Sequence, residues 1–200
     1  MTLFRTLGTL PLVAPRIVSE EDVLAGLTEL FRGCGYEAAT LTEIANATGL
    51  QKSSLYHRFP GGKQQMAAEV AVGVGERFAK DILAPLGKDG ALNERVRAVG
   101  RRLAKFYARG HRACLLDALS FGEPGSAASD ALKAAANAWT DAFASVSREA
   151  GHRPAEALTL AQDAIAAIEG ALVIARVTGD IRCFQRAIKR LPASLGLPPD

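Results

Sequence analysis

The segment 51–63 carries the side chains with the clearest chemistry, because it combines hydrogen-bond donors with positive charge and contains no Asp or Glu. Short polar side chains at the start of a helix can reach base edges in the major groove of DNA. Lys52 could donate to guanine acceptors there, and Ser53 and Ser54 can donate or accept. The segment therefore predicts a surface that reads DNA sequence.

Two short helices and a tight turn must position these side chains. Thr40 can cap the first helix, and Glu43 three residues later completes a capping box. Thr40 and Thr42 then lie at a helix N-terminus, which attracts anions, so both can donate to phosphate oxygens. Gly49 lets the chain leave this helix, and a second helix follows over 51–59. The expected inward faces are Leu41, Ile44, Ala45, Thr48, Leu55 and Phe59. This pattern predicts a helix-turn-helix.

The stretch 35–63 resembles the DNA-binding signature of the tetracycline-repressor (TetR/AcrR) family of bacterial transcription regulators. The resemblance rests on joint spacing over about thirty positions. Its landmarks are Gly35, Tyr36, Thr40, Ile44, Ala45, Gly49, Leu55, Tyr56, Phe59, Gly61, Gly62 and Lys63. It implies that a tyrosine, its two neighbours and the lysine that opens the next helix contact phosphate or bases: Tyr56, His57, Arg58 and Lys63. Beyond this quarter of the chain, the resemblance extends only to helix number and length.

Two positions depart from the family pattern. Gln51 stands where relatives often have a better N-cap such as Ser, and Ser53 replaces a frequent Gly. We expect both to change which operator is read more than whether DNA is bound. The alternative for Tyr56 and His57 is that they only pack against neighbouring helices, although a Tyr ring can pack while its hydroxyl reaches out.

Length and composition restrict the fold class and the compartment. The 200 residues suit one domain or a small domain on a larger one, and no segment alternates with period two, so the class is all-α. A net charge of +3 does not by itself indicate a nucleic-acid binder, but the acidic segment 19–34 lies apart from the basic segment 51–63. Three scattered cysteines (Cys34, Cys114 and Cys183) argue against a disulfide framework and favour a cytoplasmic protein.

Residues 1–17 are interpreted as a flexible arm rather than a signal peptide, because Pro11 and Pro15 interrupt a mildly apolar stretch. The less favoured alternative is that Arg5 and Arg16 reach a DNA phosphate or the minor groove. No apolar run approaches membrane-spanning length on this reading, so we expect no membrane partner.

Helix signals divide the remaining chain into a head and a body. The expected helices are 20–32, 41–48, 51–59, 62–83, 92–109, 113–121, 128–150, 154–178 and a last one, capped by Asp180, that ends before Pro192. Nine helices, three plus six, are the architecture of the family that the chain resembles. The predicted organisation is an arm (1–17), a helix-turn-helix DNA-binding domain (18–63) and an effector-binding and dimerisation domain (64–200).

A single helix-turn-helix makes few contacts, and a two-fold dimer gains affinity by spanning half-sites about 34–36 Å apart. The predicted dimer interface is the last two helices. The helix over 154–178 carries an apolar strip whose small residues would permit close approach in a four-helix bundle between subunits. Its members are Ala164, Ala167, Ile168, Ala171, Leu172 and Ala175. The alternative is that the strip faces only its own body.

The resemblance also implies a pocket in the body for a small-molecule effector that the sequence does not identify. Candidate lining residues are mostly aromatic, with few polar groups: Phe78, Phe106, Tyr107, His111, Cys114, Asp117, Trp139 and Phe143. Each could be an ordinary core residue, since Phe106, Trp139 and Phe143 recur at helical core spacing.

No pattern indicates catalysis, a metal or a cofactor. His111 and Cys114 lie three residues apart, but a metal site or a nucleophile pair needs further partners, and none is close in sequence. A role of Cys114 as a redox sensor is slightly favoured over a metal site or a nucleophile pair. A buried cysteine, however, usually acts only as a small apolar residue. The predicted helix over 92–109 is rich in basic residues. We interpret these residues as a solvent-exposed face of the helix, and the alternative is that they attract an anionic effector.

We therefore expect a cytoplasmic homodimer that binds double-stranded operator DNA, as a repressor that a small molecule releases from its operator. An activator or a ligand-independent regulator with the same head is the main alternative. An all-α enzyme is a third, which the sequence does not favour.

Overall fold

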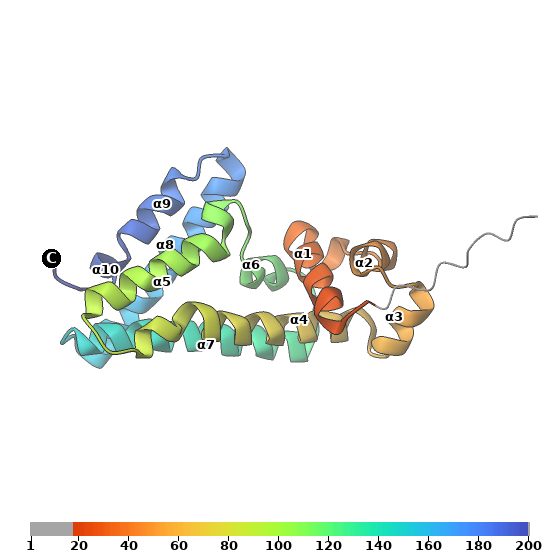
Figure 1. Ribbon diagram of the computed structural model, residues 1–200, viewed down its shortest axis with the longest axis horizontal. Coiled ribbons are helices and arrows are strands. Elements are labelled where there is room, and N and C mark those ends of the chain that lie inside the picture. The colour runs from red at the N-terminus through yellow and green to blue at the C-terminus, as the bar shows by residue number, and fades with distance from the viewer. Residues whose placement is uncertain (1–17, 200) are drawn as a thin grey trace, which may run out of the picture.

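The computed structural model describes residues 18–199, and within this range every regular element is a helix (Figure 1). The expectation of an all-α fold is confirmed. The predicted arm, with Arg5 and Arg16, lies outside the described residues. In chain order the elements are α1 (Glu20–Ala38), α2 (Leu41–Thr48), α3 (Lys52–Arg58), α4 (Gly62–Phe78), η1 (Ala79–Leu83), η2 (Ala84–Gly87), α5 (Leu92–Phe106), η3 (Ala108–Gly110), α6 (Leu115–Ser120), α7 (Ser126–Glu149), α8 (Pro154–Thr178), α9 (Arg182–Lys189) and α10 (Leu191–Ser194).

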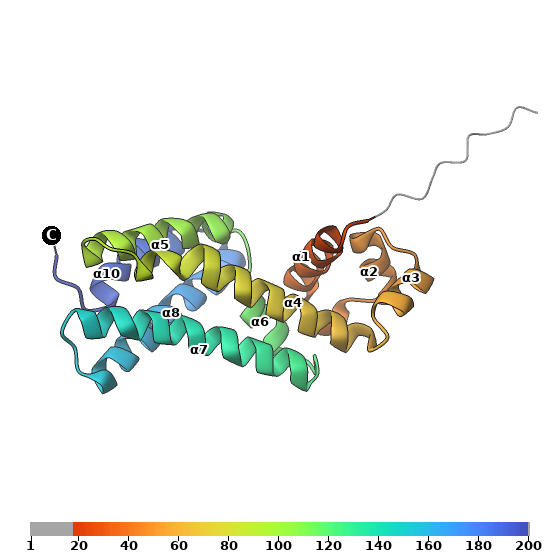
Figure 2. The ribbon, with the colours of Figure 1, turned by 60° about the horizontal axis from the view of Figure 1, so that its bottom comes forward.

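The helices form an elongated molecule with two ends. Figures 1 and 2 show α1, α2 and α3 gathered at one end, which we call the head, and α5, α8, α9 and α10 at the other. Helices α4 and α7 run side by side along the length and join the two ends. Helix α4 is therefore a direct covalent and packing connection between the body and the head.

Helix α1 is longer than its sequence pattern predicts. Ser19 caps it, since its hydroxyl accepts a hydrogen bond from the Asp22 backbone N–H at 3.1 Å. The predicted end near Arg32 is wrong because only Gly35 leaves helical geometry, at φ 76°, and a last turn resumes after it. That turn buries Tyr36 against Phe31, with ring centroids 6.2 Å apart.

Two apolar cores stabilise the ends of the molecule. The head core unites α1, α2 and α3 with the first half of α4, and it also includes Leu115 and Leu119 of α6 and Ala128 of α7. The body core packs α5, α7, α8 and α9 around Trp139 and Phe143. Because residues of α6 and α7 complete the head core, the head is packed against the body over a broad surface.

The region after α4 departs from the expected continuous helix over 62–83. Regular α-geometry ends at Phe78, a π-turn covers η1, and Pro85 lies in the 3₁₀ turn η2. The last predicted helix corresponds to α9, which ends before Pro192 as expected, and a further short helix, α10, follows with Pro192 in its first turn. Asp180 does not occupy the N-cap position, which is Ile181, although its carboxylate accepts a hydrogen bond from the Arg182 N–H at 2.9 Å.

The basic residues of α5 are only partly a solvated face. The Arg95 guanidinium donates to the carbonyls of Leu86 and Lys88 at 2.9 and 3.2 Å, and it pairs with Glu149. Arg102 donates to the Asp81 carbonyl. These two residues therefore hold the irregular turns η1 and η2 against α5, and other basic side chains of the segment remain exposed: Arg101, Lys105 and Arg109.

Helix α8 is long and apolar enough to span a membrane by length and composition alone. The expectation that no apolar run reaches such a length is therefore wrong for this helix. One side of α8 packs into the body core, while Leu158, Ile174 and Val177 are exposed. Apolar side chains thus lie on the exposed side of α8 as well as in the core, next to the exposed polar side chains of Gln162, Asp163 and Arg176.

Candidate nucleic-acid interface

Helix α2 begins with the predicted capping box. The Thr40 hydroxyl accepts from the Glu43 N–H at 3.2 Å, and the Glu43 carboxylate accepts from the Thr40 N–H at 2.8 Å. The Thr40 hydroxyl also donates to that carboxylate at 2.8 Å. These hydrogen bonds lower the pKa of the Glu43 carboxyl. The Thr40 hydroxyl is thus engaged inside the molecule, whereas exposed Thr42 is the better placed donor to a phosphate.

The turn to α3 follows from Gly49, whose φ of 70° is accessible to glycine with little strain. Leu55 and Phe59 anchor α3, with exposed fractions of 1% and 0%. The opposite face is exposed and includes five of the side chains expected to contact DNA: Lys52, Ser53, Ser54, Tyr56 and His57. Gln51, at the N-cap position, makes no capping hydrogen bond with its side chain, so the first turn of α3 keeps unsatisfied N–H groups.

Arg58 occupies a different position from the one expected. Its guanidinium makes two hydrogen bonds to the Glu69 carboxylate, at 3.3 and 2.9 Å, and pairs with Glu20 at 3.6 Å. It also lies over the Phe59 ring, 4.7 Å from the centroid. These contacts compensate the charge of Arg58 and tie α3 to α4 and α1, and a contact of Arg58 with DNA stays a prediction.

Lys63 is likewise engaged inside the head. Its ammonium group donates to the carbonyls of Tyr36 and Glu37 at 2.9 and 3.2 Å, and it lies 4.4 Å from the centroid of the Tyr36 ring. A cation there satisfies the last carbonyls of α1 and complements the helix dipole. In the absence of DNA, Lys63 thus fixes α1 against α4, and its contact with a phosphate stays a prediction. The sequence pattern gave no signal for the contact with α1, since the partners are backbone atoms twenty-six and twenty-seven residues away.

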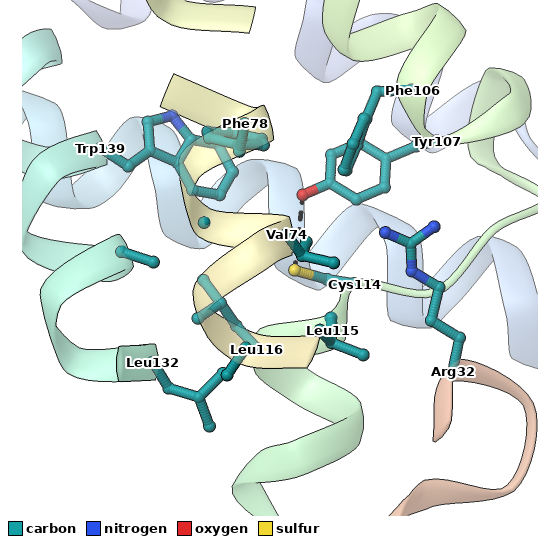
Figure 3. A pocket seen from close by; sticks show the side chains of 13 residues that line it. Arg32, Val74, Phe78, Phe106, Tyr107, Cys114, Leu115, Leu116, Leu132 and Trp139 are labelled. Atoms are coloured by element: carbon teal, nitrogen blue, oxygen red, sulfur yellow. Dashed lines mark hydrogen bonds between the residues drawn. The ribbon is translucent and has the colours of Figure 1, made fainter. Parts of the chain in front are cut away.

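A second site lies where the head meets the body. Apolar and aromatic side chains from α4, α5, α6 and α7 enclose a cavity, and Arg32 of α1 closes one edge (Figure 3). Five expected residues line it: Phe78, Phe106, Tyr107, Cys114 and Trp139. His111 and Phe143, which were expected there, do not: His111 is exposed, and Phe143 packs behind Trp139 with ring centroids 5.8 Å apart. Asp117 is also absent from the lining and pairs with Arg176 at 2.9 Å.

The lining includes residues that the sequence pattern did not indicate: Arg32, Ala71, Val74, Gly75, Leu115, Leu116, Leu132 and Ala135. Most have ordinary core character, and only Arg32 could have been noticed as a charge on the buried side of α1. The free volume between these side chains is about 30 Å³, which suits a water molecule or two. A drug-sized ligand needs several hundred Å³, so it would have to move the walls, including Phe78 of α4.

Polar groups in this region are few and poorly paired. The Tyr107 hydroxyl donates to the Cys114 sulfur at 3.4 Å. Burial raises the pKa of the Cys114 thiol to about 12 and that of Glu169, on neighbouring α8, to about 7. A thiol with so high a pKa is a poor nucleophile. This property argues against the hypothesis that Cys114 is a redox sensor.

The predicted dimer residues on α8 need correction. Five of them are buried in the chain's own core, with exposed fractions of 1–3%: Ala164, Ile168, Ala171, Leu172 and Ala175. The spacing of the strip does not reveal which side of α8 faces out, because apolar and small residues occur on its exposed side as well as on its buried side. The sixth residue of the predicted strip, Ala167, is exposed. It lies on the outer face of α8 together with Leu158, Thr159, Gln162, Asp163, Ala166, Gly170, Ile174 and Val177.

Comparison with known proteins assigns both parts of the chain. Residues 23–70 match the model of bacterial regulatory proteins of the tetR family, and residues 93–190 match the C-terminal domain of LmrA/YxaF-like transcriptional regulators. The HTH-type transcriptional regulator LmrA of Bacillus subtilis (strain 168) is 45% identical over 51 residues, which are 26% of this chain and 27% of that protein. The alignment therefore spans about a quarter of the curated relative.

Solved structures share the whole fold at low sequence identity. A TetR transcriptional regulator from Legionella pneumophila superposes with a TM-score of 0.79 at 19% identity, covering 90% of this chain and 98% of that one. The TetR family regulator CifR, solved as a cysteine mutant with 26-bp operator DNA, has a TM-score of 0.71 at 20% identity, covering 93% and 100%. These similarities concern the arrangement of the helices.

Proposed function

The chain belongs to the TetR family of bacterial regulatory proteins, and from this premise we propose that it is a cytoplasmic, homodimeric transcriptional repressor that a small molecule releases from operator DNA. The observation that carries the proposal is the exposed face of α3. It presents Lys52, Ser53 and Ser54 at the helix N-terminus, without a carboxylate on the helix, at the end of an elongated molecule. This is the geometry with which a recognition helix enters the major groove.

The contacts divide into two kinds by position. Lys52, Ser53 and Ser54 are exposed on the first turn of α3, from where they would read base edges. Thr42, Tyr56 and His57 lie around them and would contact phosphates, which fix orientation without reading sequence. Lys52→Ala or Ser54→Ala should therefore change the preference among operator variants. An equal loss of affinity on every sequence would contradict the base-reading role.

Release by an effector is supported by the placement of the cavity. Its walls include α4, which enters the head, and α1, which belongs to the head. A ligand that enlarges the cavity would displace these helices and change the separation of the two heads of a dimer. Such a ligand shifts the equilibrium only by its difference in affinity for the two states.

A catalytic function has no comparable support. Among residues 18–199 no group of three or more His, Cys, Asp or Glu side chains could hold a metal ion. The family matches are transcriptional regulators rather than enzymes.

The direction of regulation is tested with a reporter gene placed behind the DNA immediately upstream of this gene. Deletion of the gene should raise reporter expression, and complementation with the wild type should lower it again. Complementation with Ser54→Ala is the matched control, since it should restore less repression from the same amount of protein. A fall in expression on deletion would instead indicate an activator.

A further inference from the structure

We infer that the cavity beside Arg32 takes an apolar molecule carrying one carboxylate, and that Arg32 is the residue that pairs with this group. The inference rests on the proposed function only in treating the cavity as the effector site. Its basis is the position of a buried cation at the edge of an otherwise apolar chamber (Figure 3).

Arg32 is buried without adequate compensation of its charge. Only 6% of its side chain is exposed, and its Nε–H has no hydrogen-bond partner among the described residues. Within residues 18–199 the carboxylate paired with it is that of Glu29, which lies at 3.4 Å and is mostly exposed. Glu29 also faces Arg112 at 3.7 Å, so one carboxylate serves two guanidinium groups. Burial lowers the pKa of Arg32, although a guanidinium remains charged at neutral pH.

An anionic ligand would complete this arrangement. The desolvation cost of the guanidinium is already present in the folded protein, and a carboxylate can accept two parallel hydrogen bonds from it. The cation also lies 5.1 Å from the centroid of the Phe106 ring, which fixes its position. Figure 3 shows the guanidinium next to Tyr107 and Phe106, at the edge of the cavity nearest the head.

The side chains at the opposite end of the cavity determine the chemical character of the remaining part of the ligand. Its walls there are Phe78, Leu116, Leu132 and Trp139, and the rings of Phe78 and Trp139 lie 4.8 Å apart. These side chains offer apolar contact and no charge. Arg32 at one edge and aromatic walls at the other thus select a molecule with an acidic group at one end and a hydrocarbon or aromatic body.

The position of Arg32 on α1 gives the ligand a direct contact with the head. Arg32 is on the same helix as Phe31, which lies in the head core. A carboxylate that draws the guanidinium inward would act on α1, while the apolar body of the ligand acts on Phe78 of α4. The two helices that support α2 and α3 would then respond together.

The test is isothermal titration calorimetry of the full chain with two matched pairs of probes: octanoate and octanamide, and 4-phenylbutanoate and 4-phenylbutanamide. Each pair differs only in the charge of the terminal group. We expect the carboxylate to bind about ten- to hundredfold more tightly than the amide, as for a hydrogen-bonded charge. Arg32→Met should abolish this preference and leave amide affinity unchanged. Arg112→Met, which removes a nearby guanidinium that does not line the cavity, should preserve it.

Equal affinity within both pairs, no binding of any probe, or a preference that survives Arg32→Met would overturn the inference. If Arg32→Met does not fold, Arg32→Gln replaces it, with the same expectation. The fluorescence of Trp139, the single Trp of the chain, reports whether the probe enters this cavity. The calorimetry is done without DNA, so a negative result would overturn the carboxylate inference without bearing on DNA binding. Likewise, a failure of the protein to bind DNA would not change the result of the calorimetry.

Discussion

Lys63 illustrates how a single side chain can have two competing roles in a DNA-binding head. Its ammonium group is shared between two carbonyls of α1 and the face of Tyr36. A phosphate would have to draw it away from these partners or bind beside them. The structural role is therefore the one with measurable consequences in the absence of DNA.

Lys63→Met should lower the free energy of unfolding by about 1–2 kcal/mol, because two hydrogen bonds and a cation–π contact are lost while the aliphatic stem is kept. Urea denaturation followed by circular dichroism measures this difference. Lys52→Met is the matched control. Lys52 is exposed on α3, and within residues 18–199 the structure shows no ion pair that involves it. Equal stability of Lys63→Met and wild type would contradict the structural role.

The side chains on the outer face of α3 could be predicted from the sequence because local spacing determines them. Thr40, Glu43 and Gly49 act on neighbours within a few residues, and the pattern identified all three roles. Arg58 and Lys63 could not be predicted in the same way, because their partners (Glu69, Glu20, Tyr36 and Glu37) are brought close only by tertiary packing. Arg32 does carry a local signal, as a charge on the buried side of α1, but its place at the cavity depends on tertiary packing.

At the scale of elements, the capping box of α2 makes the stability of the head depend on pH. The pKa of Glu43 is lower in the folded protein than its ordinary value of 4.5, so its contribution is present above that value and is lost as the pH falls through the folded pKa. Glu43→Gln should thus reduce the melting temperature at neutral pH, and the difference from wild type should shrink in acid. A difference that stays constant down to acid pH would mean that the Glu43 charge does not stabilise α2.

The crossing of α1 and α2 depends on a glycine. A Cβ atom at Gly26 would lie 2.2 Å from the Ala47 carbonyl oxygen, so Gly26→Ala must push the two helices apart. We expect a loss of stability of about 1–3 kcal/mol, typical of overpacking. Gly33→Ala on the same helix has no atom within 4 Å of the new Cβ and should stabilise by about 0.5–1 kcal/mol. Thermal unfolding of both variants distinguishes packing from helix propensity, and similar effects at the two positions would contradict the close crossing.

Element boundaries show where sequence patterns lose information. Caps and breakers placed most helices within a few residues, because these signals act locally. The expected helix over 62–83 spans α4 and η1, but the π-turn of η1 could not be predicted, because the contacts of Arg95 and Arg102 of α5 with this region have no local signature. The sequence does not reveal which side of α8 is buried, because apolar residues occur on its exposed side as well as on its buried side.

At the scale of the whole molecule, the exposed face of α8 is the proposed contact between two copies of the chain. Ala166→Glu should give a monomer, because it places a bulky charge among the small exposed side chains that would have to pack closely in the proposed dimer. Light scattering coupled to gel filtration measures the mass. Ala134→Glu, on the exposed side of α7, is the control and should remain a dimer. A dimeric Ala166→Glu protein would place the interface elsewhere.

The central claim is that the dimer reads a specific DNA sequence, and fluorescence anisotropy tests it most directly. The probe is a labelled duplex from the region immediately upstream of this gene, and the control is a scrambled duplex of equal length at near-physiological salt. We predict a preference of about a thousandfold or more for the natural duplex. Equal, weak binding to both duplexes, or no binding to either, would contradict the account.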